Sequence, residues 1–231
     1  MTAIVLQARL DSSRLPNKSL LPLGGRPLIF RVMEALNRVP ADKRILACTD
    51  DSVAAFAPLA DEAGYELLSG PKDDVLARYC LVIRTYNIHR VIRATGDNPF
   101  VFADAASSIN AEAMTLNADY AGYSGLPYGA GVESISAEVL LRADKEAVAP
   151  YEREHVCPYV YCHPELFYLH RPLAPLCWQG GSARKLLRVT VDTEDDYKKA
   201  QILYTGLDKL DSEEQYQGAA IIKTYKTIFN I

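Results

Sequence analysis

The sequence lacks the features that mark secreted, membrane-spanning and zinc-binding proteins. Its five cysteines form an odd set without a C-x-x-C pair, which argues against a disulfide framework and against a zinc site. No apolar run reaches the roughly 18 residues that a membrane-spanning helix needs. Residues 1–9 have neither the basic start nor the apolar core of a signal peptide. These absences lead us to expect a cytoplasmic protein without a membrane partner.

The chain also lacks an excess of positive charge. Its 25 lysines and arginines face 29 aspartates and glutamates, a net charge of −4 at pH 7, so we expect no nucleic-acid partner. Hydrophobic residues make up 49% and charged residues 23%, values near globular averages that exclude a disordered or fibrous chain. Internal repeats, low-complexity tracts and clear linkers are absent. The sequence therefore predicts one domain over residues 1–231, with an irregular, proline-rich insertion at about 150–185.

Short apolar runs alternate with segments of helical period through the first two-thirds of the chain. This alternation predicts an α/β fold of βαβ units with a mainly parallel central sheet. The expected strands are residues 4–6, 44–50, 65–69, 89–95, 118–123, 132–136 and 186–191. Such sheets bind ligands on the loops that follow the carboxyl ends of their strands. The unusual loops at those ends are 8–26, 69–73, 96–100 and 192–194.

Local signals predict where three helices begin. Pro58 is expected to open a short helix that stops at Gly64, and Asp73 is expected to cap a long helix. Thr193 and Asp196 form a capping pair for another helix. The second and third of these helices follow two of the unusual loops.

The loop after the first expected strand carries three cations within ten positions, Arg9, Arg14 and Lys18. Ser12 and Ser13 add hydroxyl groups, and the backbone N–H groups of such a turn form an anion-binding nest. This combination predicts a binding site for a polyphosphate. Neither a Walker sequence nor G-x-G-x-x-G is present, so the loop is not one of the common phosphate-binding motifs. The alternative is that these cations are solvated loop charges.

Two aspartates, Asp97 and Asp192, end two of the expected strands. If those strands are neighbours in one parallel sheet, both carboxylates lie over the same edge. Mg²⁺ prefers oxygen ligands and usually takes one or two carboxylates together with substrate phosphates. The pair therefore predicts a metal-bridged nucleotide site. The alternative is that Asp97 belongs to an ordinary Asp-Asn-Pro turn and Asp192 caps a helix.

Six segments of the chain are similar to the motifs of a known family, and they occur in the same order as in that family. Three of them are Ala8-Arg9-x-x-Ser12-x-Arg14-Leu15-Pro16-x-Lys18, Thr95-Gly96-Asp97-Asn98-Pro99 and Val191-Asp192-Thr193. The others are Gly70-x-x-Asp73-Asp74-Val75-Leu76-x-Arg78-Tyr79, Pro127-Tyr128-Gly129 to Glu133, and Tyr151-Glu152-Arg153-Glu154-His155-Val156-x-Pro158-Tyr159. The first three resemble the sugar-acid cytidylyltransferases, such as 3-deoxy-manno-octulosonate cytidylyltransferase. The last three resemble the spore-coat polysaccharide biosynthesis branch of that superfamily, and the likeness covers about residues 3–205.

The resemblance implies a three-layer Rossmann-like nucleotidyltransferase fold with a mainly parallel, mixed central sheet. It implies an enzyme that transfers CMP from CTP to a sugar acid or similar polar acceptor and releases pyrophosphate, for surface polysaccharide or related biosynthesis. The implied cofactor is Mg²⁺, and the implied assembly is a homodimer.

The resemblance also implies roles for individual residues. Arg14 and Lys18 would hold the triphosphate together with Arg9, and Asp97 and Asp192 would hold the metal. Arg14, Lys18, Asp97 and Asp192 would then be the catalytic residues. The residues implied around the nucleoside are Ala8, Ser12, Gly70 and Thr95.

The acceptor side is predicted from fewer signals. Glu133, Arg153 and His155 are candidate acceptor-binding residues, and the alternatives are buried ion pairs for the first two and a structural role for His155. Residues 172–185 and 206–231 match no motif, which leaves the identity of the acceptor open.

Two other functions compete with nucleotidyl transfer. One is a glycosyltransferase that uses a preformed nucleotide-sugar and has less need of Arg14 and Lys18, and the other is a non-catalytic nucleotide-binding protein.

Overall fold

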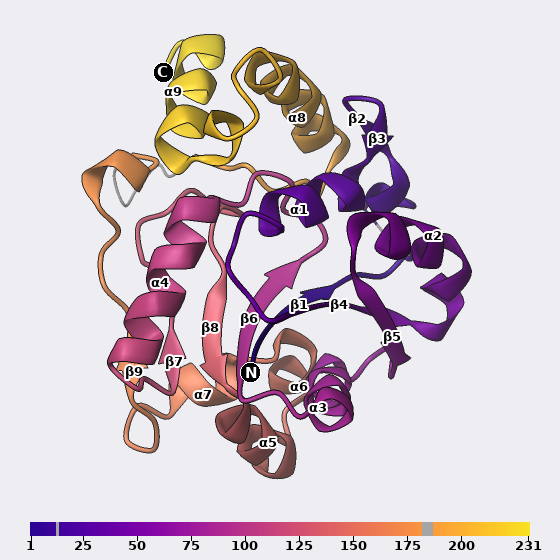
Figure 1. Cartoon of the computed structure of the whole chain (residues 1–231), viewed down its shortest axis with the longest axis vertical. Coiled ribbons are helices and arrows are strands. Elements are labelled where there is room, and N and C mark those ends of the chain that lie inside the picture. The colour runs from indigo at the N-terminus through magenta and orange to yellow at the C-terminus, as the bar shows by residue number, and fades with distance from the viewer. Residues whose placement is uncertain (13, 182–186) are drawn as a thin grey trace.

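A computed structural model describes residues 1–12, 14–181 and 187–231. Its centre is a seven-stranded sheet in the order β5-β4-β1-β6-β8-β7-β9 (Figure 1). The strands are β1 Thr2–Gln7, β4 Lys43–Thr49, β5 Glu66–Gly70, β6 Arg90–Thr95, β7 Tyr120–Ala121, β8 Glu133–Ser136 and β9 Leu169–His170. Only β8 runs against its neighbours in the described sheet. The prediction of a mainly parallel, mixed sheet is confirmed.

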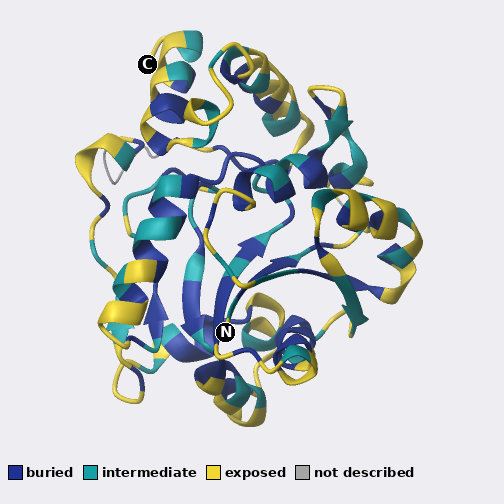
Figure 2. Ribbon diagram, in the orientation of Figure 1, coloured by how far each residue is buried: buried dark blue, intermediate teal, exposed yellow. Residues whose placement is uncertain are grey.

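Helices cover both faces of this sheet. They are α1 Leu28–Leu36, α2 Val53–Ala63, α3 Val75–Tyr86, α4 Ala103–Thr115, α5 Ala137–Glu146, α6 Pro150–His155, α7 Pro158–Cys162, α8 Glu194–Leu207 and α9 Gly218–Phe229. Side chains alternate along a strand, so Ile4 and Leu6 of β1 pack with α1, α4, α8 and α9, while Ala3 and Val5 pack with α3, α5 and α7. The central strands β1, β4, β6 and β8 are mostly buried between the two layers, whereas the edge strands β5 and β9 are partly exposed (Figure 2). The predicted three-layer α/β architecture is confirmed.

The strands β1, β6, β7 and β9 end at one common edge of the sheet. Gln7 of β1 lies opposite Thr95 of β6, and Ala121 of β7 lies opposite His170 of β9. Because these strands share a direction, the loops that leave them lie together at that edge, where α/β sheets bind their ligands. A small separate hairpin, β2 Pro22–Leu23 and β3 Arg26–Pro27, follows the first of these loops.

The expected strand at 186–191 is wrong over its described residues, 187–191. They form a single bridge, between Arg188 and Tyr128, and Val191 N–H donates to the Asp97 carbonyl at 2.9 Å. The position beside β6 is taken by β8, so this segment crosses the ends of the strands instead of joining the sheet. Asp192 is therefore brought to the edge by loop-to-loop hydrogen bonds. Leu186 lies outside the described residues.

Two of the predicted helix starts differ from the structure. Pro58 lies inside α2 and does not open it. Proline has no N–H to donate to the carbonyl of Ala54, four residues earlier. Ala54 is exposed, so water is available as a donor in its place. The cap of α3 is Asp74 and not Asp73, because the Asp74 carboxylate accepts the Ala77 N–H at 2.9 Å. The capping pair of Thr193 and Asp196 at the start of α8 is confirmed.

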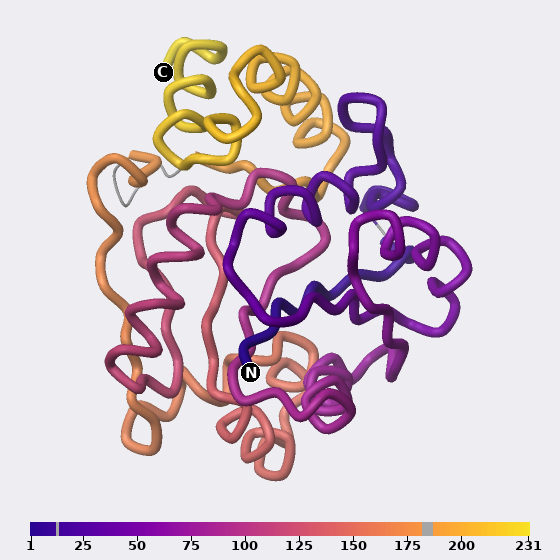
Figure 3. Tube along the Cα trace, viewed as in Figure 1, coloured from indigo at the N-terminus to yellow at the C-terminus, as the bar shows by residue number. Residues whose placement is uncertain are grey.

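The chain after β9 runs along one side of the molecule towards α9 (Figure 3). Asp104 of α4 holds this segment, since its Oδ2 accepts the Trp178 indole N–H at 2.8 Å and its Oδ1 accepts the Gly218 N–H at 3.0 Å.

Among the described helices, none is long and apolar enough to cross a membrane. The assignment of residues 1–231 to one domain with an insertion at 150–185 stays a prediction.

Candidate active site

A cavity of about 800 Å³ opens at the carboxyl edge of the sheet. Its walls come from the loops after β1, β6 and β7, from β8, and from α6 and α7. Most of the site residues predicted from the sequence line it. They are Ala8, Arg9, Ser12, Arg14, Lys18, Thr95, Asp97, Glu133, His155 and Asp192. Gly70 and Arg153 lie outside the lining, and Ser13 lies outside the described residues.

Lys18 joins the two aspartates that the sequence singled out. It begins a short 3₁₀ helix, Lys18–Leu20, at the end of the first loop. Its ammonium lies 3.0 Å from Asp97 Oδ2 and 3.0 Å from Asp192 Oδ1, and it donates to the Val191 carbonyl at 3.0 Å. Three segments distant in the chain therefore meet at one cation.

Asp192 is surrounded by positive charge. Arg14 lies 3.1 Å from its Oδ1, and Arg188 lies 2.5 Å from its Oδ2. Burial by itself would raise the pKa of Asp192, but Lys18, followed by Arg14 and Arg188, lowers it below the ordinary aspartate value. The carboxylate is thus kept ionised. Arg188 also contacts Asp196 at 3.2 Å, which fixes its guanidinium beside the start of α8.

Asp97 is oriented by the tight turn in which it lies. The Thr95 hydroxyl donates to Asp97 Oδ1 at 2.7 Å, and the Asn98 side-chain amide donates to the same hydroxyl at 2.8 Å. Gly96 leaves no room for a side chain, because a Cβ there would lie 2.7 Å from Ile29 Cδ1. With Oδ1 held in this way, Oδ2 is directed at Lys18.

The donor set of this pair fits a hard divalent cation. Two carboxylate oxygens, one from Asp97 and one from Asp192, already converge on the single positive charge of Lys18. In the described part of the chain, no group of three or more His, Cys, Asp or Glu side chains forms a metal site. Two carboxylates with the remaining positions left to phosphate and water is the arrangement that Mg²⁺ favours.

The part of the cavity next to α3 contains an arginine, Arg78, that belongs to a family-like motif but for which the sequence predicted no role. Arg78 of α3 lines the cavity and is 2% exposed. One of its terminal nitrogens donates to the Pro71 carbonyl at 2.9 Å, and its Nε has no partner among the described residues. Burial lowers its pKa. Gly70 packs against this side chain, since a Cβ there would lie 3.2 Å from Arg78 Cγ.

The floor of the other part of the cavity is a buried polar cluster. Arg93 of β6 donates to Glu133 Oε2 at 2.5 Å, and the Tyr120 hydroxyl donates to Glu133 Oε1 at 2.7 Å. Cys157 Sγ lies 3.5 Å from Oε2. Burial raises the pKa of Tyr120, and the charge of Glu133 raises it further. Both oxygens of Glu133 are thus engaged within the protein, as expected for the ion-pair alternative, while its carboxylate still lines the cavity.

His155 is held at the cavity wall by a strained turn. It ends α6, and the next residue, Val156, has φ +74° and ψ −57°. The Cys157 N–H donates to the His155 carbonyl at 2.9 Å, which closes the rarer, strained form of the γ-turn. Such a conformation costs about 1–3 kcal/mol and persists where the surroundings impose it. Here the fully buried Val156 side chain does so, and the Tyr151 ring lies 4.5 Å from the His155 ring.

Arg153 faces away from the cavity. Its guanidinium contacts Asp74 Oδ2 at 2.5 Å and Asp144 Oδ1 at 2.9 Å, which ties α6 to α3 and α5. The hydrogen bond to Asp74 raises its pKa. This geometry is that of a structural ion pair, the alternative that the sequence left open for Arg153.

Although the quoted motifs contain Tyr128 and Glu154, several cavity residues were assigned no role from the sequence. They are Tyr120, Tyr128, Glu154, Tyr161 and Arg171. Three of them lie in or next to the irregular segment at 150–185, where no hydrophobic period shows which side chains point inward.

The chain is similar to known proteins in sequence and in fold. The model of the cytidylyltransferase family matches residues 3–225. The spore coat polysaccharide biosynthesis protein SpsF of Bacillus subtilis is 30% identical over 210 residues, 87% of this chain and 85% of the relative. A solved cytidylyltransferase from Leptospira borgpetersenii superposes with a TM-score of 0.84 at 23% identity, covering 99% of this chain and 94% of the other. A CMP:2-keto-3-deoxy-manno-octonic acid synthetase complexed with CTP superposes with a TM-score of 0.67 at 17% identity, covering 88% and 98%.

Proposed function

The chain belongs to the cytidylyltransferase family, and from that premise we propose that it transfers CMP from CTP to a sugar acid or similar polar acceptor. Pyrophosphate is the second product, and the pathway is surface polysaccharide or related biosynthesis. The observation that carries the proposal is the meeting of Lys18, Asp97 and Asp192 at one point of the cavity wall.

The triphosphate binds along the loop after β1. Arg9, Arg14 and Lys18 line one wall of the cavity, and their positive charges neutralise the triphosphate. The backbone of the turn adds N–H donors. Lys18 leaves the two aspartates and takes the phosphates as its new partners. The nucleoside lies beyond, near Ala8, Ser12 and Thr95, where the Nε–H of the buried Arg78 has no partner among the described residues.

Asp97 and Asp192 would hold a divalent cation, Mg²⁺ by the chemistry of the ligands. Bound there, the cation would polarise the α-phosphate and neutralise charge on the phosphate chain. The Thr95 hydroxyl and Arg188 keep the two carboxylates in place by holding the oxygens that face away from Lys18.

The reaction is an in-line attack of an acceptor oxygen on the α-phosphorus. The bond between the α-phosphorus and the bridging oxygen breaks, pyrophosphate leaves with the electron pair, and the attacking hydroxyl gives up its proton to water. Positioning and charge neutralisation catalyse such transfers, so the residues needed are cations and metal ligands. Arg14 and Lys18 stabilise the charge that develops on the departing pyrophosphate.

The acceptor occupies the half of the cavity between the buried floor and α6. Glu133, His155 and the tyrosines of that half offer hydrogen-bonding groups and aromatic faces, which suit a polyhydroxylated ligand. His155 is held towards this space by the turn at Val156.

The comparisons support cytosine and an acid acceptor through what is known of the similar proteins. One solved neighbour is, by its title, a CMP-sugar-acid synthetase complexed with CTP, and the matching family is named for cytidylyl transfer. Family membership favours nucleotidyl transfer over glycosyl transfer and over a non-catalytic role. The homodimer and the cytoplasmic location stay predictions.

A pyrophosphate-release screen tests the proposal. All four nucleoside triphosphates are combined with a panel of sugar acids, phosphonates and polyols, with Mg²⁺, with Mn²⁺ and with EDTA. We expect release with CTP, dependent on the metal and on an acid from the panel. Release with another nucleotide only, or turnover of a preformed nucleotide-sugar without pyrophosphate, contradicts the proposal.

A further inference from the structure

Arg171 brings a guanidinium group to the acceptor end of the cavity. It follows β9 directly, and the Gly122 N–H, after β7, donates to the His170 carbonyl at 3.1 Å. Because β9 runs parallel to β7, the chain at Arg171 leaves the sheet at the same edge as the loops that hold the nucleotide.

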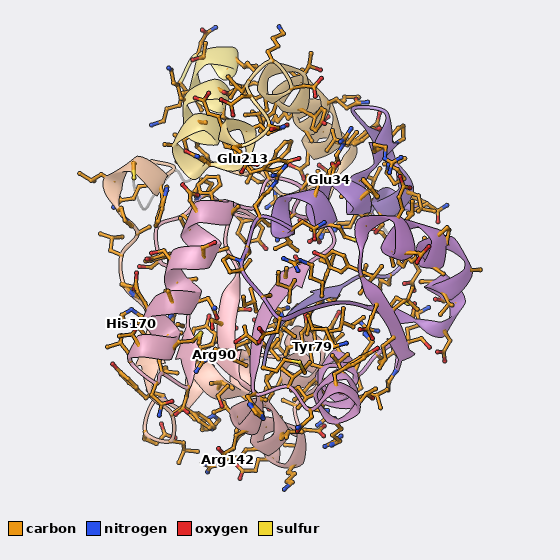
Figure 4. All side chains as sticks on the ribbon, viewed as in Figure 1. Glu34, Tyr79, Arg90, Arg142, His170 and Glu213 are labelled. Carbon is orange, nitrogen blue, oxygen red and sulfur yellow. The ribbon has the colours of Figure 1, made fainter. Side chains whose placement is uncertain are left out.

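The alternation of side chains along β9 determines which face of the sheet Arg171 takes. The ring of His170 lies beside α4 (Figure 4), with its Nε2 2.8 Å from Glu112 Oε2. Successive side chains of an extended segment point to opposite faces, so Arg171 lies on the side of α7. There its guanidinium carbon is 5.7 Å from the centre of the Tyr161 ring, a distance typical of a cation stacked on an aromatic face.

Most other cations of the cavity are paired with a carboxylate, and Arg171 differs from them in this respect. Arg9, Arg14, Lys18 and Arg93 each lie within 4.0 Å of a carboxylate oxygen. In the described part of the chain, no carboxylate lies that close to Arg78 or Arg171. Arg78 is buried against the Pro71 carbonyl in the nucleoside half. Arg171 also lacks a carboxylate partner among the described residues, but it is exposed. An acceptor that enters the cavity can therefore reach its guanidinium.

We propose that Arg171 binds the carboxylate of the acceptor and so gives the enzyme its preference for an acid over a neutral alcohol. The inference rests on the proposed function, because it needs an acceptor in this half of the cavity. A guanidinium presents its N–H donors as a planar fork that matches a carboxylate. Contact with the Tyr161 ring restricts the guanidinium to this side of the cavity before the acceptor arrives.

The test is a kinetic comparison of an acid acceptor with its methyl ester, which has the same shape without the charge. The acid is the best acceptor from the pyrophosphate-release screen. For Arg171→Gln we expect the KM of the acid to rise about 10- to 100-fold, the loss that removal of a charge-assisted hydrogen bond causes. The KM of CTP and the KM of the ester stay unchanged, and Arg171→Lys restores part of the affinity for the acid.

Arg142→Gln is the matched control. Arg142 lies on α5 at the lower edge of the view (Figure 4), outside the cavity lining. Its guanidinium also stacks on an aromatic ring, that of Phe167 at 5.2 Å, but it already has Glu146 as its partner at 3.0 Å. We expect this variant to have the kinetics of the wild type.

Three results overturn the role of Arg171. They are an Arg171→Gln variant that behaves like Arg142→Gln, equal increases in the KM of acid and ester, and a screen in which only neutral alcohols or phosphate esters accept CMP. If the wild type releases no pyrophosphate with any acceptor, the proposed function fails instead. Saturation-transfer NMR then measures binding of 3-deoxy-manno-octulosonate to the wild type and Arg171→Gln, and binding that is absent or equal in both overturns the inference as well.

Discussion

Lys18 and Asp192 are 174 positions apart in the chain, yet the lysine Nζ lies 3.0 Å from the aspartate Oδ1. The same ammonium lies 3.0 Å from Asp97 Oδ2. One cation of the protein therefore stands where the two carboxylates converge. A divalent cation bound by both carboxylates has to displace Lys18, and the phosphates of the nucleotide offer it a new partner. We therefore expect metal binding and nucleotide binding to be coupled through this side chain.

Lys18→Met tests that coupling. We expect kcat/KM for CTP to fall by a factor on the order of 10²–10³, the usual effect of removing one charge-stabilising donor. Without nucleotide, the variant binds Mn²⁺ more tightly than the wild type, because Asp97 and Asp192 have lost their shared cation. Electron paramagnetic resonance titration of Mn²⁺ measures the second effect. Unchanged Mn²⁺ affinity contradicts the coupling, and unchanged kinetics favour the glycosyltransferase alternative.

Asp97→Asn removes one of the two carboxylates and keeps the shape of the side chain. We expect metal-dependent pyrophosphate release to be lost, because the remaining carboxylate of Asp192 holds the cation too weakly. Thermal unfolding followed by circular dichroism serves as the control for an intact fold. Turnover equal to that of the wild type refutes the role of Asp97 at the metal.

Gly129→Ala tests how the loop after β7 places Asp192. Gly129 has φ +93°, and a Cβ there would lie 2.6 Å from the Thr190 nitrogen, two residues before Asp192. Displacing that segment moves the carboxylate, and misplacement by about 1 Å costs on the order of 10²-fold in rate. Pyrophosphate release by the purified variant measures the loss.

Gly25→Ala is the control for this experiment. Gly25 has φ +77° with nothing within 4 Å of an added Cβ, so the variant carries only the cost of the left-handed backbone, about 1–2 kcal/mol. We expect it to be less stable and fully active. Equal activity in the two variants contradicts the importance of the contact between Gly129 and Thr190.

Asp144→Asn tests the structural role of Arg153 through pH. Burial by itself would raise the pKa of Asp144, but Arg84 and Arg153 outweigh it and lower the pKa. A carboxyl group whose pKa is lowered by folding stabilises the protein above its ordinary value, near ~4, and loses that effect as the pH falls through the lower folded value. Urea unfolding is therefore expected to show the variant about 1–3 kcal/mol less stable at pH 7, with a smaller difference below about pH 4. A difference that is the same at both pH values contradicts this role.

The sequence predicted the parts of the site that are local in the chain. The cationic loop follows a strand of uninterrupted apolar residues, Ile4 to Leu6, and the turn at Asp97 follows another strand. Both features follow the carboxyl end of a strand, and in a parallel sheet all those ends lie at the same edge. The capping pair of Thr193 and Asp196 was predictable for the same reason, because both partners lie within one helical turn.

The features that depend on distant contacts were not predictable in this way. The segment before Asp192 has the composition of a strand, but the place beside β6 is taken by β8, and only the folded sheet shows this. Pro58 lies within α2 at an exposed position, as does Ala54 one turn earlier, and this exposure depends on how the folded chain packs. Arg171 follows the two-residue strand β9, which is too short to leave a hydrophobic period among the surrounding prolines.

A crystal structure with a non-hydrolysable CTP analogue and Mn²⁺ tests the central claim most directly. The account predicts an anomalous manganese peak about 2–2.5 Å from one oxygen each of Asp97, Asp192 and a phosphate, with the Lys18 ammonium moved onto the phosphates. A nucleotide bound elsewhere, or a manganese peak away from the two aspartates with Lys18 still between them, would contradict it.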